Sequence, residues 1–218
     1  MRNAAPRGLD SLGLKPLHML LPLCALMAPL SAAVSCELNY PTADVARLFP
    51  GSTGFKTIYF SFANRGGAPA LRKVEARLGG FPALYAPLDV PYVVYEIYKG
   101  NEKIGYIHGV NQKGQFGVLE VFVSMDLEGR VKAFYLQRVA GQWANKFTAR
   151  KFGTQFVGLT LKDFAQYNLL TAKGSGKVAA IANPVPEAVT DFLGILRAIE
   201  KNLILMDEFF YSAAKTKP

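Results

Sequence analysis

The chain has 218 residues and a formal net charge of +9, with 50% of its residues apolar and 12% aromatic. This length and composition fit one globular domain with a substantial core, and they exclude a disordered or low-complexity chain. With only two cysteines and two histidines, the chain also excludes a disulfide framework and a zinc site built from cysteines. We therefore expect no structural metal.

Residues 1–35 have the features of a cleavable signal peptide. Basic residues at Arg2, Arg7 and Lys15 precede an apolar run from Met19 to Val34. Prolines interrupt this run, which is shorter than the roughly 20 apolar residues that span a bilayer, although an uncleaved anchor helix is the alternative. The working protein is therefore predicted to be periplasmic, or otherwise extracytoplasmic.

Two modes of cleavage are open for this segment. The small residues Ser31-Ala32-Ala33 suit a general signal peptidase. The sequence Ala33-Val34-Ser35-Cys36 instead resembles a bacterial lipobox, which makes Cys36 a candidate for lipidation and for the new N-terminus at a membrane. In both modes the mature chain keeps Cys36 as its single cysteine, because Cys24 leaves with the signal.

Residues 36–90 are predicted to form an N-terminal extension with short helices and a strand. Helical spacing of apolar residues and a run of aromatic and β-branched residues indicate these elements, and Pro and Gly mark their ends. The expected elements are a helix at 44–49, a strand at 55–62, a helix at 70–78 and an extended linker at 81–91.

Residues 91–218 are predicted to form the main domain. Four segments have the composition of strands in an antiparallel meander, with turn residues between them: 92–98, 104–110, 116–125 and 131–137. Helices are expected at 144–156, at 161–167 and, with the clearest periodicity and Pro186 in its first turn, from Val189 to Met206. The predicted fold class is α+β, a twisted antiparallel sheet packed against helices with a long C-terminal helix.

The positive charge is concentrated in one part of the chain. Loss of the signal removes three basic residues and one acidic residue from +9 and leaves +7 on the mature chain. Residues 130–177 contain nine basic residues against the single acid Asp163, a local charge of +8. Such a stretch favours an anionic ligand, an anionic membrane surface or an acidic partner, with a solvated basic face as the alternative. No nucleic acid is expected, because an exported chain rarely meets it.

Four segments, in order, give the chain a resemblance to a known family. They are Leu48-Phe49-Pro50-Gly51, Gly105-Tyr106-Ile107, the strand–turn–strand segment from Val121 to Val131, and the segment from Phe152 to Gly158. Over roughly residues 90–205 the chain resembles the FMN-binding domain of the periplasmic flavin subunits of sodium-pumping quinone reductase and Rnf complexes. The resemblance implies an extracytoplasmic flavoprotein that exchanges electrons with a membrane redox complex.

The sequence departs from this family at two places. The loop Arg138-Val139-Ala140-Gly141-Gln142-Trp143-Ala144 replaces the family's "ETpGlG" loop and has no glutamate. The family attaches FMN to the last hydroxyl of an [S/T]GA[T/S] motif, and Ala180-Ile181-Ala182-Asn183 stands in its place. Because the amide of Asn183 cannot form a phosphoester, we expect no covalent flavin, and FMN would be held noncovalently.

The candidate cofactor-binding residues follow from this comparison. A phosphate is well served by cations and by free amides at a helix N-terminus, although Pro184 and Pro186 remove two of those amides here. An aromatic face such as that of Trp143 can stack on a flavin ring, with a core tryptophan as the alternative. The candidates are Gly141, Gln142, Trp143, Lys146, Lys173, Lys177 and Asn183.

Two functions remain open at this point. The first is noncovalent flavin electron transfer with a membrane redox partner, in which the flavin carries the chemistry. The second is a non-catalytic accessory or binding module that has lost its flavin and docks its basic face on a membrane complex or an anionic membrane surface. Neither is a stand-alone enzyme. No catalytic residue is proposed, since His108 has no neighbouring nucleophile in the sequence.

Overall fold

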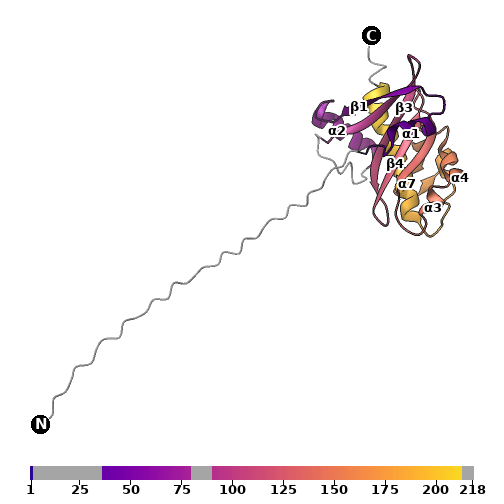
Figure 1. Cartoon of the computed structure of the whole chain (residues 1–218). Coiled ribbons are helices and arrows are strands. Elements are labelled where there is room, and N and C mark those ends of the chain that lie inside the picture. The colour runs from indigo at the N-terminus through magenta and orange to yellow at the C-terminus, as the bar shows by residue number, and fades with distance from the viewer. Residues whose placement is uncertain (2–35, 80–89, 213–218) are drawn as a thin grey trace. The chain divides into compact units, whose positions relative to one another are not determined.

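The computed structural model describes Met1 and residues 36–79 and 90–212 (Figure 1). The predicted signal peptide, apart from Met1, and all but the end of the predicted 81–91 linker lie outside the described residues. The described residues from Cys36 onward belong to one compact unit. None of the helices described is both long and apolar enough to cross a membrane.

A five-stranded antiparallel sheet forms the centre of the fold, with its strands in sequence order. The four predicted strands of the meander are present, and each pairs with the next. Gly100 and Gly129 supply the positive φ angles, +59° and +79°, that the two tight turns require. The strands are β1 (Gly54–Phe60), β2 (Tyr92–Lys99), β3 (Glu102–Lys113), β4 (Val118–Met125) and β5 (Val131–Arg138).

The strand expected within residues 36–90 is part of the same sheet. β1 pairs with β2 along its whole length, from Gly54 opposite Tyr98 to Phe60 opposite Tyr92. A boundary near residue 90 therefore falls within one folded unit. β1 and β5 are the two edges of the sheet.

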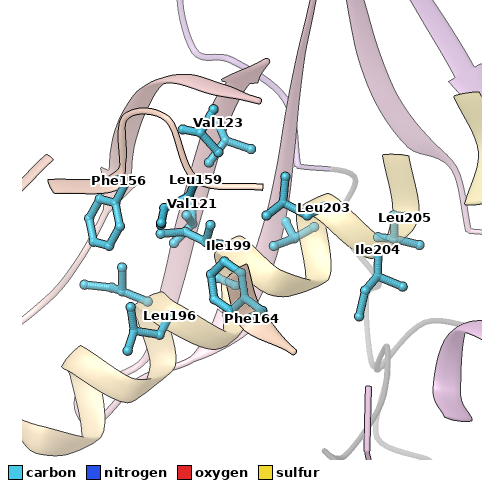
Figure 2. Packing of buried hydrophobic residues seen from close by; sticks show 14 of the residues in the cluster. Val121, Val123, Phe156, Leu159, Phe164, Leu196, Ile199, Leu203, Ile204 and Leu205 are labelled. Atoms are coloured by element: carbon cyan, nitrogen blue, oxygen red, sulfur yellow. The ribbon is translucent and has the colours of Figure 1, made fainter. Parts of the chain in front are cut away.

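The long C-terminal helix packs against one face of the sheet. This helix is α7 (Val189–Met206), and it lies along β3 and β4 (Figure 1). Figure 2 shows side chains of α7, among them Leu196, Ile199 and Leu203, gathered with Val121 and Val123 of β4 in the larger hydrophobic core. The apolar spacing read from the sequence thus corresponds to the buried face of the helix, and the prediction of an α+β fold with this helix is confirmed.

Shorter elements complete this face of the molecule. Helix α2 contributes Val74 to the larger core, and η2 continues the chain beyond α7. Arg77 of α2 donates to Asp207 at 2.6 Å and to Glu208 at 3.2 Å, which connects the two elements. Their bounds are α2 (Gly67–Arg77) and η2 (Asp207–Tyr211).

The opposite face of the sheet is covered by residues 36–49. Helix α1 (Pro41–Leu48) and the residues before it pack on a second hydrophobic cluster, which includes Tyr95, Ile107 and Phe122 of the sheet. The backbone N–H of Leu38 donates to the Tyr95 hydroxyl at 3.0 Å. The sheet is therefore covered on both faces, which explains why β2 is apolar on both of its sides.

The helix predicted over 144–156 is wrong as a single element, because the chain there forms short turns. Ala149 is extended (φ −62°, ψ 137°), which separates α3 from α4. Large aromatic side chains at Phe147, Phe152 and Phe156 are buried and hold these turns against the core. The elements are α3 (Ala144–Phe147), α4 (Arg150–Gly153) and η1 (Thr154–Phe156).

The helix predicted over 161–167 is shorter than expected. Thr160 begins it with a capping box, in which the Asp163 carboxylate accepts from the Thr160 backbone N–H and hydroxyl, both at 2.8 Å. The chain then leaves the helix and pairs two short strands. The elements are α5 (Leu161–Phe164), β6 (Tyr167–Asn168), β7 (Lys173–Gly174) and α6 (Gly176–Ala179).

Candidate functional site

The loop after β5 and the short helix α3 that follows it contain four of the residues that the sequence singled out. Gly141 has a φ of +101°, and a Cβ on it would collide with the ring of Phe116. Gln142 and Lys146 are exposed, whereas Trp143 is partly buried and packs against the larger core. Trp143 thus packs against the hydrophobic core and does not present an open face to a ligand.

The other three candidates lie before α7. Lys173 is exposed on β7, and Lys177 forms an ion pair with Asp163 at 3.4 Å. The Asn183 side-chain oxygen accepts the backbone N–H of Val185 at 3.0 Å, which closes a local turn. Within the described part of the chain, no hydrogen bond or ion pair joins these three residues to the loop at 141–146.

This geometry does not fit a flavin at the family's attachment position. Asn183 offers no hydroxyl, and its carbonyl oxygen is already engaged by Val185. The amide of Gln155 binds both backbone groups of Ala182, at 2.8 Å and 3.2 Å, so the segment that would approach the cofactor is tied to the protein itself. The surroundings of Asn183 therefore do not fit a covalently attached flavin.

A large cleft lies elsewhere, between α1 and the turns that follow β5. Its volume is about 1050 Å³, and none of the seven sequence-predicted cofactor residues lines it. The end of α1 and Pro50-Gly51 form one wall, residues 148–157 form the other, and β5 lies between them. A cleft of this size is large enough for a small molecule or a short peptide segment.

The cleft carries four cations against one carboxylate. Lys99, Lys132 and Arg150 are exposed and form no ion pair with any described residue. The single carboxylate, that of Asp126, is occupied by the backbone N–H groups of Glu128 and Arg130 at 3.1 Å and 2.8 Å. The cleft therefore presents a net positive charge to whatever enters it.

The fourth cation, Arg47, is held in place on the wall of the cleft. Its guanidinium donates to Asp44 at 2.7 Å, and its Cζ lies 3.7 Å from the centre of the Tyr135 ring. Such a cation–π contact fixes both side chains. Arg47 and Tyr135 therefore form a planar, preorganised wall, whereas Lys132 and Arg150 extend into solvent.

The sequence contained a partial signal for this cleft. Lys132 and Arg150 belong to the basic stretch at 130–177, and three of the four segments that carry the family resemblance contribute lining residues. The fourth segment, Gly105-Tyr106-Ile107, lies next to the cleft. A Cβ on Gly105 would collide with the ring of Phe49, which lines the cleft. The reading of the sequence missed the cleft because its cations come from four separate segments that only the fold brings together.

Comparisons with known proteins do not assign the chain to a family. A scan against models of protein families finds no match, and a search of curated proteins finds no match either.

Cys36, the lipidation candidate, is buried in the smaller hydrophobic cluster with 8% of its surface exposed. Burial, with the charge of Glu120 as the next cause, raises the pKa of its thiol far above the ordinary value. A sulfur packed in this way cannot carry an acyl chain into a membrane unless the packing opens. The packing of Cys36 therefore does not suit the lipidated N-terminus that the sequence left open.

We expect the Cys36 thiol of the purified mature chain to react with a maleimide at least about 100-fold more slowly than free cysteine, because the thiolate is disfavoured and shielded. Full reactivity should return in guanidinium chloride. The maleimide reaction rate, measured with and without denaturant, checks the burial of the thiol. The intact mass of the protein produced in bacteria checks whether Cys36 is lipidated. A mass that includes a diacylglyceryl group would contradict this account.

On the face covered by α7, His108 is fully buried and Glu200 is partly buried. His108 is fully buried near the rings of Phe60 and Tyr92, and burial lowers its pKa to about 3, so it is a neutral core residue. Glu200 of α7 borders a small pocket together with Arg77 and Tyr167, and burial raises its pKa to about 7. Glu200 therefore makes stability depend on pH.

The variant Glu200→Gln is expected to be more stable than the natural chain at pH 8 by about 1–3 kcal/mol, and by less than about 1 kcal/mol at pH 5. The folded-state pKa lies above the unfolded one, so the stability contribution of the protonated carboxyl is complete below about pH 4.5 and is lost as pH rises through about 7. Urea denaturation at both pH values measures the difference. A difference independent of pH would contradict the assignment.

Proposed function

We propose that this chain is an exported, non-catalytic binding module that takes an acidic ligand into the cleft between α1 and residues 148–157. One observation carries the proposal: the exposed cations Lys99, Lys132 and Arg150 border one cleft and have no ion-pair partner among the described residues. Unpaired cations around a concave, partly apolar surface are well suited to a ligand with carboxylates or phosphates.

The composition of the cleft supports binding over catalysis. Its lining residues include no histidine or cysteine, and its one carboxylate is engaged by a turn. General acid–base or nucleophilic catalysis needs a titratable side chain free to exchange a proton or attack a substrate. The hydroxyls of Thr148 and Thr154 donate to backbone carbonyls and not to a general base. The other polar side chains are those of Tyr135 and of lysines and arginines, which suit the binding of an acidic group.

The predicted export and the charge of the cleft together suggest the kind of partner. We infer an acidic segment of an extracytoplasmic or membrane-bound protein. A flat anionic membrane surface suits the cleft less well, because the Arg47–Tyr135 wall lies within a concavity.

Noncovalent FMN is the second candidate, and the aromatic wall of the cleft favours it. Phe134 and Tyr135 offer ring faces, and Lys132 and Arg150 offer charges for a phosphate. When bound, FMN would supply electron transfer with a membrane partner. The residues of the cleft would bind and orient it, and no hydroxyl for covalent attachment stands at the family position.

Binding of labelled peptides by the purified mature chain tests the proposal. The acidic probe is a pool of decapeptides in which glutamate alternates with randomised residues, and the control pool carries lysine in place of glutamate. We expect fluorescence anisotropy to show at least about tenfold tighter binding of the acidic pool, lost in about 0.5 M salt because exposed charges are screened. Equal binding of both pools would contradict the proposal.

Two further measurements distinguish an acidic peptide from FMN and from a membrane surface as the ligand. Absorption bands of FMN that remain with the purified chain and are lost on denaturation would establish the flavin candidate. Co-sedimentation with phosphatidylglycerol vesicles, without preference for the acidic pool, would establish the membrane surface instead. Neither result is expected under the acidic-ligand proposal.

A further inference from the structure

The cleft runs along the edge of a β-strand and not across one face of the sheet. Successive side chains of a strand point to opposite faces, yet five consecutive residues of β5, from Lys132 to Leu136, line the cleft. The three central ones, Ala133, Phe134 and Tyr135, are all partly exposed. Solvent therefore reaches both sides of this strand where it lines the cleft.

The backbone of β5 is paired on one side only over most of its length. β4 forms hydrogen bonds with its inner side. On the outer side Val131 exchanges two hydrogen bonds with residues 158–159, at 2.8 Å each, and no other backbone bond to that side occurs among the described residues. The edge without backbone hydrogen bonds, from Lys132 to Leu136, spans about 16 Å, the length of five residues of an added strand. Gly153 lies beside Phe134 at this edge.

Open edges of this kind usually carry a feature that prevents pairing with a second copy. Here the feature is positive charge: Lys132 is on the strand itself, and Lys99 and Arg150 border the same cleft. Two copies that paired through β5 would bring these cations together, which is unfavourable. By contrast, the same cations attract a strand that carries carboxylates.

We propose that β5 accepts an extended acidic peptide of a protein partner as a sixth strand of the sheet, within the cleft. This inference rests on the proposed function and specifies its ligand. Main-chain hydrogen bonds to β5 supply the affinity common to strand addition, while Lys132, Arg150 and Lys99 select acidic side chains. The exposed side chain of Val157 and the ring of Phe134 contact the apolar residues between them.

Backbone chemistry of the probe tests strand pairing separately from charge. The acidic decapeptide pool is compared with the same pool N-methylated at four consecutive central amides, which keeps every carboxylate but removes main-chain donors from both edges of an added strand. We expect N-methylation to weaken binding by about tenfold or more. Hydrogen exchange should show slower exchange of β5 amides with the unmodified pool, and unchanged exchange at β1, the other edge.

The possible outcomes separate the two claims. If the N-methylated pool binds as tightly and β5 gains no protection, strand addition is overturned, while the acidic cleft of the proposed function stands. Protection that appears equally at β1 overturns it too, because the pairing would then be unspecific. If the acidic pool binds no better than the lysine pool, both proposals fail.

Discussion

Replacing Lys132 and Arg150 together by glutamate is expected to weaken binding of the acidic peptide pool about 30-fold at low ionic strength. Both cations are exposed in the cleft and are unpaired among the described residues, so their reversal removes two attractions and adds two repulsions. Exposed charge pairs are each worth roughly 0.2–1 kcal/mol, and four such changes amount to about 2 kcal/mol. Fluorescence anisotropy measures the change directly.

The chain offers a matched control for this variant. Lys146 and Lys173 are also exposed lysines, and they belong to the cofactor site that the sequence predicted, but neither lines the cleft. Lys146→Glu with Lys173→Glu makes the same change in net charge and should leave binding within about threefold of the natural chain. Loss of binding in the control with retention in the cleft variant would move the site to the sequence-predicted residues.

A fragment of residues 91–218 is expected to lack a cooperative unfolding transition. It would lose β1, which pairs with β2 along its whole length, and α1, which packs on the far face of the sheet. Val93, Tyr95 and Ile97 of β2 are buried in the cluster that α1 completes, and they would become exposed. Each such side chain contributes roughly 1.5–3 kcal/mol when fully buried, against a total stability of about 5–15 kcal/mol.

Circular dichroism during urea denaturation compares this fragment with the chain from residue 36 to 218. The longer chain should show one sigmoidal transition, and the fragment a gradual change without a baseline. A cooperative transition in the fragment, of similar midpoint, would show that the sheet does not need β1. It would restore a domain boundary near residue 90.

Much of the fold could be predicted from the sequence, because local patterns determine it. Alternating residues identify the strands of the meander, and the spacing from Val189 to Met206 identifies α7. The region from Ala144 to Phe156 could not be predicted in the same way. Its phenylalanines recur at spacings that suit a helix, yet the extended Ala149 interrupts it, and the aromatic side chains are held by contacts with distant residues.

The candidate site was less predictable than the fold. The basic stretch at 130–177 indicates an anionic partner, but it does not say which of its cations share a cleft. Lys132 and Arg150 join Arg47 and Lys99 only because β5 lies at the edge of the sheet, between α1 and the turns that follow it. The residues chosen by family resemblance, such as Lys177 and Asn183, have local partners at Asp163 and Val185.

Amide chemical-shift mapping of the isotope-labelled mature chain, titrated with the acidic peptide pool, tests the central claim most directly. The largest shifts are expected in β5 from Lys132 to Leu136, at Arg47 and at residues 148–157, and they should saturate together. Shifts confined to residues 141–146 and 173–183, with the cleft unchanged, would contradict it.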